Sequence, residues 1–341
     1  MNNFSSQFSI DRRLIGGNQP VYIIAEAGIS HFGSEEKAFR LVDLAVDSGA
    51  DAVKFQIFDV DAMISNASED WKRRLLPRQL KYSAFERIQT YCKSKNITFF
   101  ATAHDQPSLE YLVNLDVPAY KVGSGEVGNW PFIEKIASLD KPIIFSTGMY
   151  KIEQIYDALE AISRTNNNDV GVLHCVTEYP APPADICLEN MSLIFEKFGV
   201  VTGYSDHTKG YHIPLAAVAM GAKIIEKHIS LDFNVPNAQD WKVSCGPHDL
   251  ALFINQVRDI ESAISLRENG PTPAEKESLA WASKSLVAKK NIKFGQIISI
   301  EDLESKRPGI GIAPSFIEDL VGRTAKKDIQ TDEVIKWEFL S

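Results

Sequence analysis

The chain has 341 residues, of which 44% are hydrophobic and 24% charged, and its formal net charge is -9. This length exceeds the usual size of one hydrophobic core, so we expect one large domain and one small domain. The negative charge excludes a nucleic-acid surface, because such a surface needs a basic stripe to neutralise phosphates. The composition also excludes a disordered or collagen-like chain.

The four cysteines, Cys92, Cys175, Cys187 and Cys245, are far apart and form no C-x-x-C pair. Neither a zinc ribbon nor a dense disulfide framework is therefore expected. The segment 1–13 is polar, and no apolar run is long enough to cross a bilayer. We expect a soluble cytoplasmic protein with neither a nucleic-acid nor a membrane partner.

The first predicted element is a hairpin within residues 8–20. Two short apolar pieces flank Gly16, Gly17 and Asn18 in this segment. This pattern predicts a turn at the glycines, because glycine and asparagine tolerate the backbone conformations of tight turns. A hairpin at this position would plug the bottom of a barrel.

Eight short apolar segments follow, with helical stretches such as 35–48 and 152–162 between them. The predicted strands are 21–27, 52–58, 97–103, 119–124, 142–147, 170–176, 200–204 and 222–229. Strict alternation of strand and helix implies parallel pairing, and eight units over roughly 250 residues match a closed (β/α)8 TIM barrel. On this pattern alone, a doubly wound open sheet is the alternative.

The sequence also predicts where the domains end. The barrel domain, including the hairpin, is expected to span residues 1–267. The segment 268–282 contains Gly270 and Pro271 and predicts a linker. Residues 283–341 contain short strands punctuated by turns, which predicts a compact β-rich domain too small to be an independent enzyme.

Nearly all of the predicted strands end in polar residues. In TIM-barrel enzymes the side chains that act project from these C-terminal strand ends. Lysines such as Lys54 and Lys121 inside apolar strands require carboxylate partners or an anionic ligand, because burying an unpaired charge costs several kcal/mol. One alternative is that they pair only with Glu26 and Glu126. Eight polar strand ends together instead favour a site for a phosphate and a carboxylate.

Two histidines close neighbouring predicted strands. The imidazoles of His207 and His228 can meet over one point, and with water and substrate oxygens they suit a divalent transition metal. Two histidines are a weaker signal than three ligands, and a lone histidine is more often a structural residue. Glu226 faces the same way as His228 and is a candidate ligand, ligand partner or base.

Taken in order, the polar strings resemble the sialic acid synthase family along nearly the whole chain. The matching strings are Ile24–Gly28, Asp51–Gln56, Tyr120–Glu126, Ser146–Met149, Leu173–Cys175, Tyr179–Pro180, Gly203–Thr208 and Ile225–His228. The tail, with Lys306–Gly309 and Gly311–Pro314, resembles the antifreeze-like domain of that family. The resemblance implies a TIM barrel followed by a small β-rich antifreeze-like (SAF, β-clip) domain.

The resemblance also implies a transferase that condenses phosphoenolpyruvate with an N-acetylmannosamine-like amino-sugar aldehyde. The products would be a sialic-acid-type 2-keto-3-deoxy acid and phosphate. The implied phosphoenolpyruvate ligands are Lys54, Thr102, Lys121, Ser124, Ser146 and Thr147. His207 and His228 would hold a divalent metal, with manganese favoured over magnesium or cobalt. Glu26, with Glu226 as the alternative, would steer water or a proton.

On the sugar side, the resemblance implies contacts from Tyr179, Asp240 and Arg307 of the partner subunit. That last contact requires a domain-swapped homodimer. It gives the C-terminal domain a physical purpose, because covering the barrel mouth excludes water until the substrate is bound.

The sugar side departs from the family pattern, whereas the phosphoenolpyruvate side keeps it. Here 30–33 reads Ser-His-Phe-Gly in place of Asn-His-Asn-Gly, Ala103-His104 replaces Pro-Phe, Gly128 replaces Thr or Asn, and 236–241 is one residue longer than usual. These changes predict an aldose other than N-acetylmannosamine, such as a diamino-dideoxy sugar. The alternatives are a neutral or phosphorylated aldose, or a sugar-binding protein on a decayed synthase, which would have lost its lysines or histidines.

Overall fold

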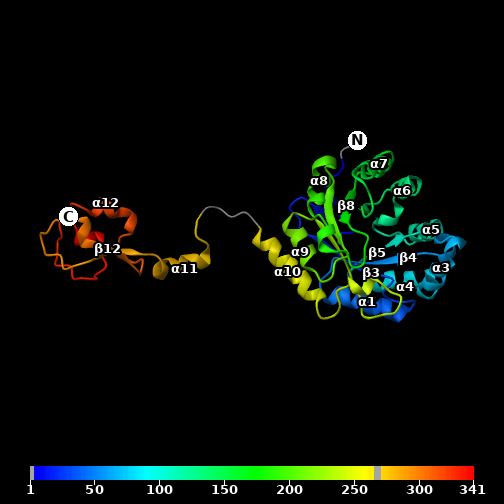
Figure 1. Cartoon of the computed structure of the whole chain (residues 1–341), viewed down its shortest axis with the longest axis horizontal. Helices are drawn as coiled ribbons and strands as arrows, with labels where there is room; N and C mark the ends of the chain where they lie inside the picture. Colours follow the sequence, from blue (N-terminus) through cyan, green and yellow to red (C-terminus); the bar gives the residue numbers. More distant parts are fainter. Residues whose placement is uncertain (1–3, 265–269) are drawn as a thin grey trace. The chain divides into compact units, whose positions relative to one another are not determined.

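The computed structural model describes residues 4–264 and 270–341. It divides into two compact units, Met1–Ser265 and Leu266–Ser341, which are coloured from blue to yellow and from yellow to red in Figure 1. A linker was expected over 268–282, but helix α11 (Pro273–Ala282) occupies most of that segment. Thr272 and Glu275 form a capping box and Pro273 takes the first helical position, so the proline begins a helix rather than marking a loop. Residues 265–269 lie outside the described residues.

The first unit is a closed barrel of parallel strands. The strands are β3 (Tyr22–Gly28), β4 (Ala52–Ile57), β5 (Thr98–Ala103), β6 (Tyr120–Val122), β7 (Ile143–Ser146), β8 (Val170–Cys175), β9 (Val201–Asp206) and β10 (Ile224–His228). They pair in chain order, and β10 closes the barrel by pairing with β3. The TIM-barrel prediction is confirmed, and the open sheet is excluded.

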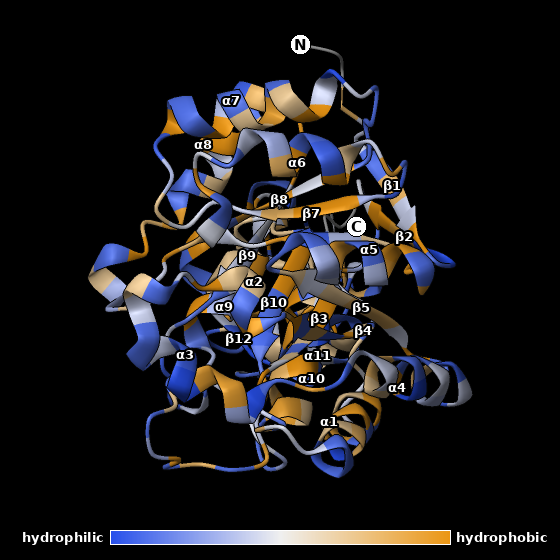
Figure 2. Ribbon diagram, turned by 90° about the vertical axis from the view of Figure 1, so that its right-hand side faces the viewer, coloured by the Kyte–Doolittle hydropathy of each residue, from blue (hydrophilic) through white to orange (hydrophobic). Residues whose placement is uncertain are grey.

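Helices surround the barrel, and most of them bury an apolar face against it, whereas α3 has no buried residue. They are α1 (Glu35–Asp47), α2 (Val60–Met63), α3 (Glu69–Leu75), α4 (Tyr82–Ser94), α5 (Gln106–Asn114), α6 (Trp130–Ala137), α7 (Ile152–Ser163), α8 (Glu189–Phe198), α9 (His212–Ala219) and α10 (Leu250–Ala263). In Figure 2 the helices α1, α4 and α7 carry both blue and orange residues, as expected for helices with one face toward solvent. Within residues 4–264 and 270–341, no helix is long and apolar enough to cross a membrane.

The N-terminal hairpin closes the bottom of the barrel. Strands β1 (Gln7–Ile10) and β2 (Arg13–Gly16) pair antiparallel, and their apolar residues pack with the first residues of the barrel strands. The chain reverses between the two strands at Asp11, whose φ is 51°. The predicted turn at the glycines is present but follows β2, where the Gln19 amide donates a hydrogen bond of 3.1 Å to the Gly16 carbonyl. Gly16 also permits a close approach, since a Cβ there would lie 2.5 Å from the Ser6 carbonyl oxygen.

The second unit is small and built around its own core. Strands β11 (Ser285–Ala288) and β12 (Leu303–Lys306) pair antiparallel, and a short helix α12 (Ile317–Leu320) follows. Buried apolar side chains, including Leu286 and Ile335, form a core that is separate from the barrel. The predicted β-rich C-terminal domain therefore has its own hydrophobic centre.

The hairpin plug yields a stability prediction. Phe8 is 3% exposed and packs inside the barrel floor against Gly171 and Ile24. We expect Phe8→Ala to lower the free energy of unfolding by roughly 3–5 kcal/mol, because the floor cannot collapse into the cavity left behind. Leu14→Ala, at a 39% exposed position of the same hairpin, should change it by less than about 0.5 kcal/mol. Urea denaturation measures both, and equal effects would show that the hairpin does not plug the barrel.

Candidate functional site

Strand register brings the polar side chains to one end of the barrel. Glu26 on β3 lies opposite Lys54 on β4 and His228 on β10, and Thr102 on β5 lies opposite Lys121 on β6. The register of β3 shifts between Glu26 and Gly28, which is a bulge of the kind that re-aims side chains next to active sites. The strands alone therefore assemble most of the predicted cluster.

The end of β10 divides its polar residues between two faces. Because side chains alternate along a strand, Glu226 and His228 point into the barrel whereas Lys227 points out toward the helices. Lys227 Nζ lies 2.5 Å from Asp206 Oδ2, and Asp206 Oδ1 also accepts a hydrogen bond from the Thr208 hydroxyl at 2.8 Å. This outward pair is fully satisfied and is structural.

A cavity of about 530 Å³ opens where the strands end. It is lined by Glu26, Lys54, Gln56, Thr102, His104, Lys121, Gly123, Ser124, Gly125, Ser146, Cys175, Thr177, Tyr179, Ser205, His207, Glu226 and His228. Every predicted site residue is among them except Thr147, Asp240 and Arg307. The structure thus gathers five of the six predicted phosphoenolpyruvate ligands, both carboxylates and both histidines around one space.

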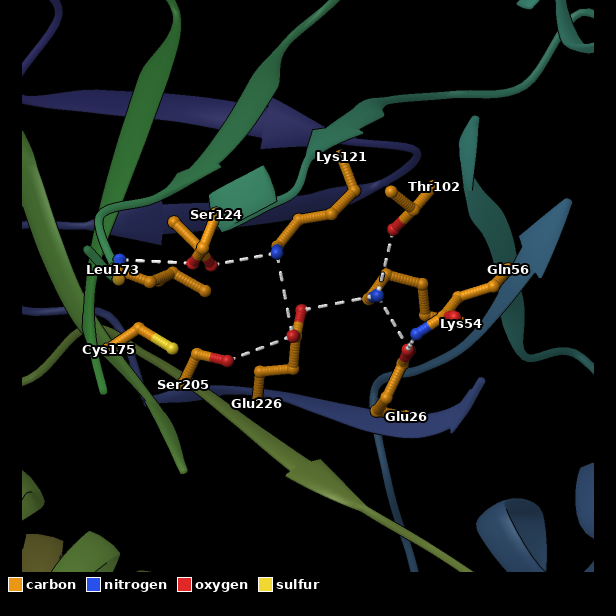
Figure 3. A network of polar contacts seen from close by, with 12 residues as sticks. Glu26, Lys54, Gln56, Thr102, Lys121, Ser124, Leu173, Cys175, Ser205 and Glu226 are labelled. Carbon is orange, nitrogen blue, oxygen red and sulfur yellow. Dashed lines mark hydrogen bonds and ion pairs between the residues drawn. The ribbon is translucent and has the colours of Figure 1, made fainter. Parts of the chain in front are cut away.

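Lys54 stands between two buried carboxylates (Figure 3). Its Nζ lies 2.7 Å from Glu26 Oε2 and 3.7 Å from Glu226 Oε2, and it donates a hydrogen bond of 3.0 Å to Thr102 Oγ1. Burial lowers the pKa of Lys54, but Glu226 and Glu26 outweigh burial and hold that pKa above its ordinary value. Lys54 is therefore a charged and well-compensated group.

Lys121 is less well compensated. Its Nζ donates to Ser146 Oγ at 2.8 Å, and the nearest carboxylate oxygen, Glu226 Oε1, lies 3.5 Å away. Burial lowers the pKa of Lys121, and Glu226 does not restore it fully. The alternative pairing with Glu126 does not occur, because Glu126 Oε2 accepts a hydrogen bond from Asn129 at 2.7 Å instead. A bound anion would supply the charge that Lys121 lacks.

The two inward carboxylates have pKa values displaced in opposite directions. Burial raises the pKa of Glu26, and Lys54 offsets this only in part. Burial also raises the pKa of Glu226, but Lys121 and Lys54 outweigh it and hold that pKa below its ordinary value. Glu226 further accepts a hydrogen bond of 3.0 Å from Ser205 Oγ. Glu226 is therefore the more firmly ionised of the two carboxylates, and Glu26 takes up a proton more readily.

The two histidines face each other across the cavity, with ring centroids 5.3 Å apart. His207 Nδ1 lies 2.7 Å from the Val176 carbonyl oxygen, which leaves Nε2 toward the cavity, where the Tyr179 hydroxyl lies 2.9 Å away. The Nδ1 atom of His228 is buried and has no hydrogen-bond partner among the described residues. Two imidazole nitrogens are thus available to a divalent ion, and the carbonyl partner of His207 is typical of a metal-ligating histidine.

The protonation states of His207 and His228 affect how well they can bind a divalent metal ion. Burial, followed by the charge of His207, holds the pKa of His228 well below its ordinary value. Burial also lowers the pKa of His207, but Cys175 and the Val176 carbonyl together raise it to about 9. A metal bound here would displace a proton from His207. No group of three or more His, Cys, Asp or Glu side chains is placed to hold a metal within the described ranges, so water and substrate oxygens must complete the coordination.

Three predicted residues lie apart from the cavity. Thr147, a predicted phosphoenolpyruvate ligand, donates its hydroxyl to the Leu173 carbonyl at 3.2 Å, because the chain turns there at the end of β7. Asp240 lines a second cavity that continues from the first, and burial raises its pKa. Arg307 belongs to the second unit, where it is exposed directly after β12. Its predicted contact with the sugar stays a prediction.

The second cavity, the mouth cavity, has a volume of about 1320 Å³ and shares Gln56, His104, Gly125, Thr177 and Tyr179 with the first. Its further lining consists of Ile29, Phe58, Met63, Trp71, Arg74, Leu75, Arg78, Asn237, Gln239 and Asp240. Arg78 connects two altered loops. Its guanidinium lies 5.7 Å from the centre of the Phe32 ring and donates a hydrogen bond of 2.7 Å to the Asn237 carbonyl oxygen. Two of the four departures from the family pattern, at His104 and in 236–241, thus line this cavity, and Arg78 links the altered loop of Phe32 to it.

Some lining residues were not singled out from the sequence. Gln56 donates a hydrogen bond of 3.1 Å to Glu26, and Ser205 donates one to Glu226. Both residues lie inside sequence strings that match the family. Their alternation with the named residues on β4 and β9 could have identified them. Arg78 gave no such signal, because it follows helix α3 and belongs to no strand end.

Comparisons with known proteins agree with this geometry. The NeuB family model matches residues 41–269, and the SAF domain model matches residues 283–341. The N,N'-diacetyllegionaminic acid synthase of Campylobacter jejuni is 39% identical over 92% of this chain and 98% of its own length. The human N-acetylneuraminate-9-phosphate synthase is 32% identical over 96% of this chain and 95% of its own.

A solved structure is similar as well. The N-acetylneuraminic acid (sialic acid) synthetase of Leptospira borgpetersenii, crystallised with citrate, superposes with a TM-score of 0.75 at 32% identity, covering 82% of this chain and 97% of that one. The family match covers most of the chain, and the relatives span nearly all of it. The chain therefore belongs to the NeuB family, the sialic acid synthase family that its motifs resemble, and is an enzyme of that kind with a C-terminal SAF domain.

Proposed function

We propose that this protein condenses phosphoenolpyruvate with an amino-sugar aldehyde to give a 2-keto-3-deoxy sugar acid and phosphate. The observation that carries the proposal is the single cavity in which Lys54, Lys121 and two facing histidines meet two carboxylates. A sugar-binding protein on a decayed synthase would not need these lysines, histidines and carboxylates. This chain keeps all of them. The relatives named above bear the names of synthases.

The two lysines are the groups that would neutralise phosphoenolpyruvate. Lys121 is the under-compensated cation and has Ser146 beside it, so its vicinity suits an anionic group. Ser124 Oγ accepts a hydrogen bond of 3.0 Å from the Gly148 amide, which fixes the hydroxyl at the same wall. A Cβ at Gly148 would lie 2.1 Å from Thr177 Oγ1 and 2.7 Å from Ser124 Oγ, so a larger residue would push these two side chains aside. Thr147 lies in the same turn, and its contact with phosphoenolpyruvate stays a prediction.

The reaction follows from the chemistry of the two substrates. The methylene carbon of phosphoenolpyruvate attacks the aldehyde carbon and forms the new C–C bond, and the aldehyde oxygen takes up a proton. Water adds to the cationic enol carbon and loses a proton, and the C–O bond then breaks so that phosphate leaves and the ketone forms. A divalent ion held by His207 and His228 would supply Lewis-acid polarisation of the aldehyde oxygen.

We assign Glu26 as the base that takes a proton from the attacking water. It accepts from Gln56, is paired with Lys54 and carries the raised pKa, so it can take a proton near neutral pH more readily than an ordinary glutamate. Glu226 stays ionised between Lys121 and Lys54 and would stabilise the positive charge that develops at the enol carbon.

The aldose that we favour is a diamino-dideoxy sugar with acylated nitrogens. Two of the altered segments, at His104 and in 236–241, line the mouth cavity together with Tyr179, and the relative from Campylobacter jejuni bears the name of a diacetyllegionaminic acid synthase. Neutral and phosphorylated aldoses are the alternatives. We also propose manganese as the metal, a cytoplasmic location, and a domain-swapped homodimer in which Arg307 of the partner subunit reaches the N-acyl end of the sugar.

The first prediction concerns the reaction itself. With manganese, phosphoenolpyruvate and one aldose of a panel, we expect phosphate and keto acid to form together. The panel contains N-acetylmannosamine, its 6-phosphate and 2,4-diacetamido-2,4,6-trideoxyhexoses. Lys121→Met should lower kcat/KM about 100-fold or more, because the anion loses its cation, whereas Lys209→Met at an exposed position after β9 should leave it unchanged. If the wild-type protein binds phosphoenolpyruvate but converts no aldose, the proposed reaction is wrong.

The second prediction concerns the metal. Chelation should abolish keto-acid formation, and added manganese should restore it. His207→Ala should lower activity at least 100-fold and weaken manganese binding measured by calorimetry, because one of two imidazole ligands is lost. His212→Ala, at an exposed histidine of α9, is the matched control and should behave as wild type. Full activity in the presence of a chelator would contradict the metal assignment.

The third prediction uses the displaced carboxylate pKa values. A base acts when it is ionised, so activity should fall as the pH drops through the raised pKa of Glu26, above the ordinary value of 4.5. Glu26→Gln should lower kcat by roughly 10²–10⁴-fold and remove this acid limb from the pH profile of kcat/KM. Glu226→Gln should lower kcat/KM but keep the limb. A limb that persists in Glu26→Gln and vanishes in Glu226→Gln would reverse the two roles.

A further inference from the structure

One histidine of the site has no part in the chemistry derived above. His104 follows β5, and its backbone amide donates a hydrogen bond of 3.2 Å to the Ile57 carbonyl oxygen. Its side chain lines the cavity of the two lysines, the mouth cavity, and a groove of about 1050 Å³ that runs past Gln106 and Phe132. His104 therefore stands where three open spaces meet.

The ring of His104 is placed but has no hydrogen-bond partner. A Cβ at Gly123 would lie 3.9 Å from its Cε1 atom, so the ring packs beside the loop that carries Ser124. Neither ring nitrogen hydrogen-bonds to a side chain or carbonyl of the described residues. His104 is only half-buried, so its ring nitrogens are open to the cavity and can pair with water or a ligand there.

The charge state of the His104 ring limits the chemical groups that can hydrogen-bond to it. Burial, together with the charges of Lys54 and Lys121, lowers the pKa of His104 to about 4. The ring is therefore neutral at physiological pH and offers one N–H donor and one nitrogen acceptor. A hydroxyl or an amide group can satisfy both, whereas a phosphate or carboxylate, which only accepts, would leave the acceptor nitrogen unpaired.

We propose that His104 determines acceptor specificity by hydrogen-bonding a hydroxyl or acylamino group of the aldose. This rests on the proposed function, in which the two lysines hold phosphoenolpyruvate and the aldose enters from the mouth cavity. Among the residues that the structure describes, only Gln56, His104, Gly125, Thr177 and Tyr179 line both spaces, and His104 is the one of these that also faces the groove. The groove gives room for the substituent that the histidine binds. The phenylalanine usual in the family at this position could make no such bond.

The test compares His104→Phe and His104→Gln with wild type on pairs of aldoses that differ in one hydroxyl or acylamino group. His104→Phe restores the usual family residue and keeps an aromatic ring, whereas the glutamine amide keeps a donor and an acceptor. We expect His104→Phe to lower kcat/KM for the preferred aldose about 10- to 100-fold and to reduce a tenfold or larger preference within one pair to about twofold. The KM for phosphoenolpyruvate should stay within twofold.

Rescue and control variants make the outcome decisive. His104→Gln should keep most of the preference, and His248→Phe, at an exposed histidine before α10, should keep all of it. A large change in the KM for phosphoenolpyruvate with the aldose preference intact would assign His104 to the other substrate and overturn the proposal. An unchanged preference in His104→Phe would also overturn it. Failure of the proposed function is distinct, because the wild-type protein would then convert no aldose.

Discussion

The arrangement depends on a balance of four buried charges inside the barrel. Glu26, Glu226, Lys54 and Lys121 are each at most 4% exposed, and no one of them could stay ionised there alone. Lys54 touches both carboxylates, so the network holds together even with the cavity open above it. Lys121 is the member with the weakest protein partner, so the cluster leaves one cation incompletely compensated and is not a closed salt bridge.

The parallel barrel keeps this balance with little help from loops. The register places Glu26 opposite Lys54, and alternation turns Glu226 inward while Lys227 pairs with Asp206 outside the barrel. A one-residue slip of β3, β4 or β10 would turn the inward charge of that strand toward the apolar layer under the helices. The hairpin plug supports the same geometry from below, because it fills the barrel floor and leaves only the C-terminal strand ends open.

The sequence was sufficient to predict the parts that follow periodicity. Alternating apolar strands and helices predicted the barrel, and polar strand ends predicted most of the cavity lining. It was not sufficient where a side chain has two possible partners. Thr147 bonds to the Leu173 carbonyl, and Lys121 meets Glu226 rather than Glu126, because the exact turn geometry and register decide these contacts. The sequence also did not predict the helix that begins at Pro273, because proline is common both in loops and at the first position of a helix.

The charge cluster and the mouth cavity are built on different kinds of structure. The lysines and carboxylates lie on strands whose register permits few substitutions. The mouth cavity is lined by loops and by short helices, and Arg78 there contacts both Phe32 and Asn237, which lie far apart in the sequence. A change in one of these loops would alter the packing of the other, while the strand-borne charges stay fixed. His104 lies at the boundary, directly after a strand and within the mouth, where a single replacement can act on the acceptor without disturbing the charge balance beneath it.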